Sequence, residues 1–191
     1  AFVHLWVSMP CTGGAAYQTI NEVRYPKWIE INRKRRDVTL GVIRFIYQLS
    51  LDHPHVTFSV ELPVNNRMWS DIDELFKEND GLYQVRLDGC MLGYTDPYTN
   101  NPTKKPWKVI SSDWRIRDGI SNKFICNKKH EHTITHGRNT PISGLYTDDM
   151  ADVILQSLAS VGVHNILACS GEGPGDHAND ELGNGSRDRI F

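Results

Sequence analysis

The stretch Phe2-Val3-His4-Leu5-Trp6-Val7-Ser8-Met9-Pro10-Cys11-Thr12-Gly13-Gly14 decides the fold class that the sequence predicts. Its first part, Phe2–Met9, is rich in β-branched and aromatic residues and stops abruptly at Pro10, which is typical of a buried strand that enters a loop. The segment Pro10–Gly14 is that loop. The segments that follow indicate which kind of sheet this strand belongs to.

Helix and strand patterns alternate after this loop. Apolar residues recur at roughly helical spacing from Lys27 to Ser50, which fits one long helix or two. Later segments have the pattern of strands (His55–Leu62, Leu82–Leu92 and Trp107–Ser111) or of a short amphipathic helix (Asp71–Phe76). This order predicts an open, mostly parallel, Rossmann-like α/β sheet whose last two strands form an antiparallel edge.

The connection between Phe2–Met9 and His55–Leu62 is long enough for a helical crossover, so we expect these two apolar strands to be parallel neighbours. Further along the chain, Thr147, Asp148 and Asp149 cap a final helix. We divide the chain into an α/β core at 1–112, a basic insertion at 113–146, a helix and strand at 147–169, and an irregular acidic tail at 170–191.

The composition is that of an ordinary globular protein of one or two domains, with 191 residues, 39% of them hydrophobic, and a formal net charge of −2. No apolar run approaches the roughly 18 residues of a membrane span, and the N-terminus lacks the pattern of a signal peptide. We therefore expect an intracellular protein, nuclear or cytoplasmic, with no membrane partner. The cysteines are widely spread, which favours free thiols.

Charge is unevenly distributed along the chain. Residues 100–140 hold nine basic and three acidic side chains, whereas residues 141–191 hold two and eight. The basic middle is compatible with a polyanionic partner, although a solvated loop face that carries lysines is the commoner explanation.

Two residues that could carry chemistry lie at the ends of the first two predicted strands. Cys11 lies in the turn after the first strand, where ligands bind in open α/β sheets, and is a nucleophile if its pKa is lowered. Glu61 ends the second strand between apolar neighbours, where burial raises the pKa of a carboxyl group and lets it donate a proton near neutrality. The alternatives are a small residue that fills a turn and a glutamate that faces water. Neighbouring strands would bring Cys11 and Glu61 to the same rim of the sheet.

At these residues the chain resembles the cytosine-C5 DNA methyltransferases. Pro10-Cys11 is similar to the family's nucleophile loop, and Glu61-Leu62-Pro63 is similar to its Glu-Asn-Val strand end, with leucine in place of the asparagine. The segment 83–94 resembles the family's next strand with its Tyr-Gly turn, and the segment 104–109 resembles the basic stretch that enters the last strand. The layout of residues 1–112 is also similar to methyltransferase-like segments of retroelement polyproteins.

The resemblance implies that Cys11 adds as a thiolate to C6 of a flipped cytosine while Glu61 protonates N3. It implies phosphate contacts from Lys104, Lys105 and Lys108, which represent the family's Gln-x-Arg-x-Arg run only loosely. It implies S-adenosylmethionine as the methyl donor, but the chain begins after the place where the family's Gly-rich cofactor loop lies. We therefore expect either that an upstream polypeptide completes the cofactor site or that the module no longer binds the cofactor. In both cases the chain would be incomplete or inactive alone.

A second constellation consists of Cys126, His130, His132 and His136, spaced as Cys-x3-His-x-His-x3-His. Sulfur and nitrogen donors match the ligand preferences of zinc, and four candidate ligands predict a structural rather than a catalytic zinc site. The alternative is an exposed loop of lysines and histidines without a metal.

Arg115 and Arg117 are further candidates for nucleic-acid binding, beside Trp114, which would either stack on a base or pack in the core. We rank a methyltransferase-like domain that acts on DNA first. A non-catalytic, zinc-stabilised nucleic-acid-binding or assembly module ranks second. A cysteine hydrolase with Cys11 as nucleophile ranks third, because it needs a histidine base that the sequence cannot place.

Overall fold

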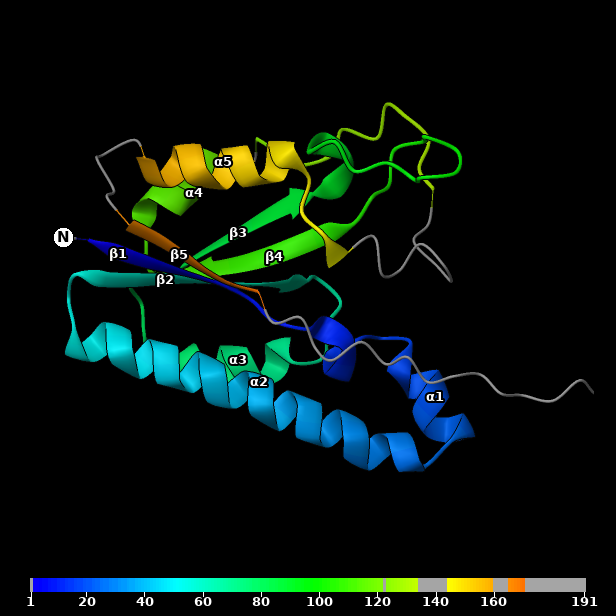
Figure 1. The fold of residues 1–191 in the computed structure, drawn as a ribbon, viewed down its shortest axis with the longest axis horizontal. Coiled ribbons are helices and arrows are strands. Elements are labelled where there is room, and N and C mark those ends of the chain that lie inside the picture. The colour runs from blue at the N-terminus through cyan, green and yellow to red at the C-terminus, as the bar shows by residue number, and fades with distance from the viewer. Residues whose placement is uncertain (1, 122, 134–143, 160–164, 171–191) are drawn as a thin grey trace, which may run out of the picture.

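The computed structural model describes residues 2–121, 123–133, 144–159 and 165–170, the last segment by its backbone only. They form a five-stranded sheet between two layers of helices (Figure 1). The strands are β1 (Val3–Ser8), β2 (Val56–Pro63), β3 (Tyr83–Asp88), β4 (Pro106–Ser111) and β5 (Asn165–Ser170). The helices are α1 (Gln18–Arg24), α2 (Lys27–Asp52), α3 (Trp69–Phe76), α4 (Trp114–Ile120) and α5 (Asp148–Ala159), and two 3-10 turns, η1 (Cys11–Gly14) and η2 (Gly89–Met91), follow β1 and β3.

The strands lie in the order β3-β4-β2-β1-β5. β1 is parallel to both of its neighbours, with Val3 opposite Val56 of β2 and Asn165 of β5. The predicted parallel pairing of Phe2–Met9 with His55–Leu62 is therefore confirmed, and the expected helix, α2, lies in the connection between them.

β4 runs against the other strands of this sheet, because it is antiparallel to both β2 and β3. The predicted antiparallel pairing of the last two strands is confirmed, but the reversed strand lies second from the edge and not at the edge. Trp107, Val109 and Ile110 are buried, so β4 has the apolar character of a central strand. β3 exposes Gln84 and Arg86, and polar or charged side chains suit a sheet edge.

Helices cover both faces of the sheet, each face with its own apolar core (Figure 1). The core beneath α2 and α3 includes Val7, Ile43, Phe58, Leu62 and Ile72. The core beneath α4 and α5 includes Trp6, Leu87, Trp107, Ile116 and Met150. Trp6 and Val7 belong to different cores because successive side chains of a strand point to opposite faces. With both faces covered, the rims of the sheet are the places left for polar chemistry.

α2 is one continuous helix, which decides between the one or two helices that the sequence allows. Its buried positions include Leu40, Ile43 and Ile46, which recur at the spacing of one helical face. The helix stops before Pro54, since a residue that precedes proline disfavours the helical conformation.

α4 occupies the start of the basic segment 113–146. The sequence predicts an irregular extension of the sheet there, with candidate zinc ligands, and the helix shows that the segment is not irregular at this end. Asp113 caps the helix, because its Oδ1 accepts a hydrogen bond from the Arg115 N–H at 3.0 Å. The expected final helix is α5, and β5 follows it, as predicted for 147–169. The tail beyond Ser170 lies outside the described residues. None of the helices in the described ranges combines the length and the apolar character needed to cross a membrane.

Candidate functional site

The loop that carries Cys11 is held from two sides. Asn66, in the turn after β2, donates from Nδ2 to the Cys11 carbonyl oxygen at 2.9 Å. The Arg67 N–H donates to the Gly14 carbonyl at 2.8 Å, and Arg36 of α2 donates from Nη1 to the Gly13 carbonyl at 3.1 Å. These bonds fix η1 at the carboxyl end of β1, so the position of Cys11 is set by β2 and α2 as well as by its own strand.

Both glycines of this loop are required by close packing. A Cβ on Gly14 would lie 1.9 Å from Asn66 Oδ1, and a Cβ on Gly13 would lie 2.9 Å from the Arg35 Cβ. A side chain at either position would therefore push η1 away from its partners. Sequence reasoning missed Asn66, because no motif marks it and its contact with Cys11 arises only when β1 and β2 pair.

Glu61 lies near the carboxyl end of β2 as a buried carboxyl group, only 4% exposed. Its Oε2 accepts hydrogen bonds from Tyr146 at 2.6 Å and from Ser8 at 3.1 Å. Burial raises the pKa of Glu61, and the two hydrogen bonds and the Lys105 charge oppose that rise in part. The structure thus favours the buried, proton-holding glutamate over the alternative that faces water.

Cys11, Glu61 and Lys105 influence one another's ionisation. Burial raises the pKa of the Cys11 thiol, the Lys105 charge lowers it, and the Glu61 charge raises it. Burial lowers the pKa of Lys105, whose Nζ lies 4.9 Å from the centroid of the Trp107 ring. The carboxyl ends of β1 and β2 therefore bring a thiol, a carboxyl group and an amine to one poorly hydrated rim.

Tyr94 adds an unusual hydroxyl group to this rim. The side chain is 5% exposed and packs edge-on against Trp107, with 4.9 Å between the ring centroids. Burial raises the pKa of Tyr94, and the Glu61 charge adds to that rise. Within the described part of the chain the hydroxyl has no hydrogen-bond partner. A buried hydroxyl without a partner indicates a place for a water molecule or for a polar atom of a ligand.

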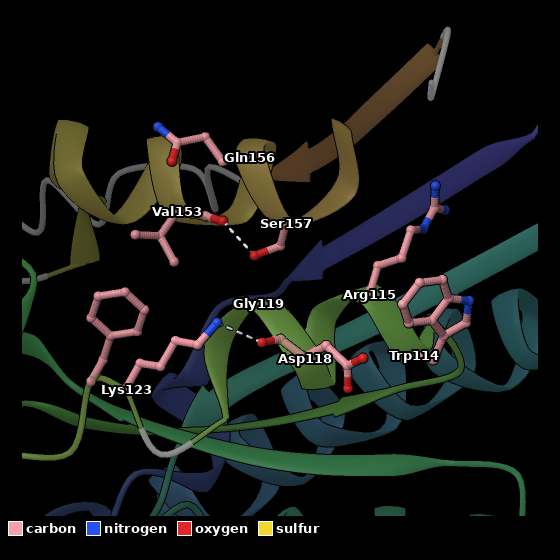
Figure 2. Close-up of a pocket in the computed structure, with 9 residues that line it drawn as sticks. Trp114, Arg115, Asp118, Gly119, Lys123, Val153, Gln156 and Ser157 are labelled. Carbon is pink, nitrogen blue, oxygen red and sulfur yellow. Dashed lines mark hydrogen bonds between the residues drawn. The ribbon is translucent and has the colours of Figure 1, made fainter. Parts of the chain in front are cut away.

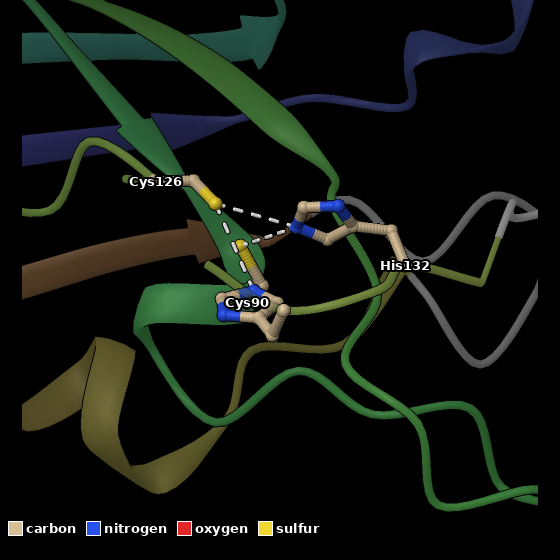
Figure 3. Close-up of side chains that lie close together, drawn as sticks. Cys90, Cys126 and His132 are labelled. Carbon is tan, nitrogen blue, oxygen red and sulfur yellow. Dashed lines mark hydrogen bonds between the residues drawn. The ribbon is translucent and has the colours of Figure 1, made fainter. Parts of the chain in front are cut away.

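The second constellation gathers into one cluster, shown in part in Figure 3. The donor atoms of Cys90, Cys126, His130 and His132 all lie within 4.8 Å of one another. Cys126, His130 and His132 are among the predicted ligands, whereas His136 lies outside the described residues. Cys90 is a further candidate ligand that sequence reasoning missed, since it belongs to η2, far from the others in sequence.

The spacing of these donors fits a tetrahedral metal ion. Sγ of Cys126 lies 3.3 Å from Nε2 of His132 and 3.7 Å from Nε2 of His130, and Sγ of Cys90 lies 3.3 Å from Nε2 of His132. Zinc bonds of about 2.3 Å to sulfur and about 2.0 Å to nitrogen place the ligands of a tetrahedron roughly 3.5 Å apart. The cluster could therefore hold a metal ion with little rearrangement.

Neighbouring groups orient the thiols of this cluster. The Lys128 N–H donates to Cys126 Sγ at 3.3 Å, which the positive φ of 61° at Lys128 permits. The Cys126 N–H donates to Asp88 Oδ2 at 2.9 Å. Burial and the neighbouring Cys126 raise the pKa of Cys90 to about 12, so two thiolates would not coexist here without a cation.

The predicted phosphate contacts do not form one surface. Lys108 donates to Asp73 at 2.8 Å and lies over the Trp69 ring, on the side of α3. Arg117 belongs to α4 on the other face, where it pairs with Asp118. Lys104 and Lys105 directly precede β4, and both are partly buried.

Arg115 is unsuited to phosphate contact, which corrects the expectation from sequence. The residue is 8% exposed, and its Nε and Nη2 donate to Asp113 at 2.9 and 2.6 Å. A third donor, Nη1, is bonded to the Leu158 carbonyl at 3.2 Å. The Arg115 guanidinium is therefore bonded to groups within the protein and not available to a phosphate. Trp114 is 49% exposed, so it is not a core residue.

A cavity of about 370 Å³ lies between α4 and α5 (Figure 2). Its lining includes Trp114, Asp118, Lys123 and Gln156. α4, which lines the cavity, begins after Ser111 at the carboxyl end of β4, where Ser111 pairs with Ser59 of β2. Glu61 pairs with Val109, further toward the other end of β4. The cavity is thus separate from the rim that holds Cys11 and Glu61.

No protein-family model, curated protein or solved structure matches the chain. Function is therefore inferred from the residues of the chain itself.

Proposed function

We propose that the chain is a cytosine-C5 methyltransferase-like domain that acts on DNA. The observation that carries this proposal is the shared rim of β1 and β2, where Cys11 and Glu61 lie close enough for their charges to affect each other. Ligands of open α/β sheets bind at this end of the strands. The resemblance of Pro10-Cys11 and Glu61-Leu62-Pro63 to the family's motifs supports the same assignment.

Each residue has one chemical role in this proposal. The Cys11 thiolate forms a bond to C6 of a flipped cytosine, and the electron pair of the C5–C6 double bond moves toward C4. The pair of the N3–C4 double bond then takes the proton of Glu61 at N3. The upward shift of the Glu61 pKa by burial supports this role, because it favours the protonated form of the acid. Lys105 favours the thiolate form of Cys11, which burial otherwise disfavours.

S-adenosylmethionine would supply the methyl group, and β5 suggests where this chain would hold it. β5 pairs with β1 in parallel, with Ser170 opposite Ser8, so the chain leaves the sheet beside the Cys11 loop. The sequence that follows is Gly171-Glu172-Gly173-Pro174-Gly175. Glycines at such spacing after a parallel strand let the backbone approach a nucleotide cofactor. We propose residues 171–175 for this role, and the upstream polypeptide expected from the sequence stays an alternative prediction.

We further propose that the cluster of Cys90, Cys126, His130 and His132 holds a structural zinc ion. Four protein ligands close the coordination shell, and two thiolates balance the charge of the ion. Such a site would fasten the basic loop around Lys128 to the end of β3. Contact with DNA would then involve Lys104 and Lys105, and the basic loop beside them.

A second candidate function is a non-catalytic, zinc-stabilised nucleic-acid-binding or assembly module. The observation that favours it is the near-tetrahedral cluster, which needs no catalytic step. A cysteine hydrolase stays the third prediction, because it still needs a histidine base for Cys11.

Calorimetric titration of the intact chain with S-adenosylmethionine separates the two candidates. We expect saturable binding by the wild-type chain and none by Gly173→Val, in which a side chain blocks the close approach of the backbone. Gly144→Val is the matched control, because a Cβ there meets nothing within 4 Å. Binding that appears only when an upstream segment is added would favour the upstream polypeptide. Zinc and DNA binding without any cofactor binding would favour the second candidate.

A further inference from the structure

Tyr146 reaches the proposed site from a distant part of the chain. It lies 85 residues after Glu61 and directly before α5, yet its hydroxyl donates to Glu61 Oε2 at 2.6 Å. The same hydroxyl accepts a hydrogen bond from Trp6 Nε1 at 2.9 Å. An indole N–H can only donate, so the two hydrogen bonds run in one direction, from Trp6 to Tyr146 and from Tyr146 to Glu61. The phenol proton is therefore committed to Glu61.

The residue that follows Tyr146 is also held in place. The adjacent Thr147 donates from Oγ1 to the Leu92 carbonyl and accepts from the Met150 N–H at 3.2 Å, where it caps α5. The Tyr146 ring packs against the core beneath α4 and α5. Both ends of the side chain are thus anchored before any ligand binds.

We propose that Tyr146 is a positioning residue for Glu61, which fixes the carboxyl group at the sheet rim and decides which of its oxygens carries the proton. Tyr146 and Ser8 both donate to Oε2, so Oε2 is an acceptor in the neutral acid as well as in the anion. A protonated Glu61 then carries its proton on Oε1. This inference rests on the proposed role of Glu61, because a single fixed donor oxygen is what transfer to N3 of a cytosine requires.

The test measures Glu61 directly, by a pH titration of the intact chain with 13C-labelled glutamate observed by NMR. The hydrogen bond from Tyr146 stabilises the charged form, so its removal in Tyr146→Phe raises the pKa of Glu61. The other titratable groups that face Glu61 are Cys11, Lys105 and Tyr94, and all three are kept in this variant.

Tyr94→Phe is the matched control, since it removes a buried hydroxyl that makes no hydrogen bond to Glu61. We expect the pKa of Glu61 to rise clearly in Tyr146→Phe and not to rise in Tyr94→Phe. The rise in Ser8→Ala should be smaller, because the hydrogen bond from Ser8 is longer than that from Tyr146. An unchanged pKa of Glu61 in folded Tyr146→Phe would overturn the proposal. If that variant does not fold, Trp6→Phe tests the same pair of hydrogen bonds. Without the Trp6 donor the Tyr146 hydroxyl is less well oriented, so the pKa of Glu61 should again rise.

The failures of this inference and of the proposed function are distinguishable. A shift in Tyr146→Phe together with an absence of methyl transfer by the wild-type chain would reject the function and leave the positioning of Glu61 standing. Methyl transfer by the wild-type chain, with no shift in the variant, would reject the positioning role alone. In an active enzyme the variant should also keep its activity to higher pH, because the acid form of Glu61 then persists further.

Discussion

Gly14 and Gly41 occupy opposite surroundings, and this contrast offers a test of how tightly the Cys11 loop is held. A Cβ on Gly14 would lie 1.9 Å from Asn66 Oδ1, whereas a Cβ on Gly41, within α2, meets nothing within 4 Å. We expect Gly14→Ala to lower the free energy of unfolding by about 1–3 kcal/mol, because the loop must move. Gly41→Ala should raise it by up to about 1 kcal/mol, since alanine favours a helix.

Urea denaturation of both variants measures these changes. The rate at which iodoacetamide alkylates Cys11 should also rise in Gly14→Ala, as the displaced loop exposes the thiol. Equal stability of Gly14→Ala and the wild-type chain would show that the loop adapts, and that its position is not set by close packing.

Arg115 and Asp113 form an ion pair beneath the helices, in contact with His4. Removal of one partner leaves a buried charge without compensation, which costs about 3–5 kcal/mol. We therefore expect Arg115→Met to be strongly destabilised in thermal or urea unfolding. Arg117→Met is the control, because the Arg117 pair with Asp118 is exposed and its loss should leave the stability unchanged.

The same pair makes the stability depend on pH. Burial alone would raise the pKa of Asp113, but hydrogen bonds from His4 and Arg115 and the Arg115 charge outweigh it and hold this pKa well below its usual range. A lowered folded-state pKa stabilises the protein above the unfolded value of about 3.9, and this contribution is lost as the pH falls through the folded-state value. The stability difference between the wild-type chain and Arg115→Met should thus narrow below about pH 4. A difference that stays constant down to pH 2 would contradict the proposed pairing.

For single residues, the sequence identifies candidates whose neighbours along the chain form a pattern. It misses residues that reach the site only through contacts formed on folding. Cys11 and Glu61 stand out because each lies close to the carboxyl end of an apolar strand. Asn66, Tyr146 and Cys90 do not, since each acts on a residue far away in sequence and no local pattern marks that contact. The prediction of Arg115 as a nucleic-acid-binding residue is wrong, because the sequence around an arginine does not show that its side chain is buried.

Among the elements, the loop from Cys126 to His132 is the one whose order we expect to depend on a metal. Purified chain should contain about one zinc per molecule, and Cys90→Ser and His132→Ala should lose it. Cys11→Ser is the matched control, because Cys11 lies outside the cluster. Elemental analysis and melting curves with and without chelator measure the effect.

Chelation should lower the melting temperature of the wild-type chain, and acid should weaken zinc binding because the ligands must be deprotonated. A zinc content below about 0.2 per chain, with no change of melting temperature in chelator, would favour an exposed loop without a metal.

The order of helices and strands follows from sequence more readily than the order of strands in the sheet. A long amphipathic stretch between two apolar strands requires a crossover, so the pairing of β1 with β2 and the presence of α2 could be predicted. The position of β4 between β2 and β3 could not be predicted, because apolar content indicates a central strand but not which strands pair with it. α4 was missed because it is short and its cap, Asp113, stands among basic residues.

At the scale of the whole molecule, two helical layers seal both faces of the sheet and leave one rim where β2, β1 and β5 end together. Cys11 and Glu61 lie at this rim, and the Gly-rich sequence 171–175 follows the third strand. The same fold brings Tyr146 from the start of α5 onto Glu61. Cys11, Glu61 and Tyr146 thus come to one rim from three separate parts of the chain.

The most direct test of the proposed function is transfer of a labelled methyl group from S-adenosylmethionine to cytosine-containing DNA by the intact chain loaded with zinc. We expect label at C5 of cytosine, its loss in Cys11→Ser, and a large decrease in Glu61→Gln, because the amide has no acidic proton to give to N3. Absence of transfer by a wild-type chain that binds both the cofactor and DNA, or transfer that survives Cys11→Ser, would contradict the assignment of Cys11 and Glu61 as the reacting pair.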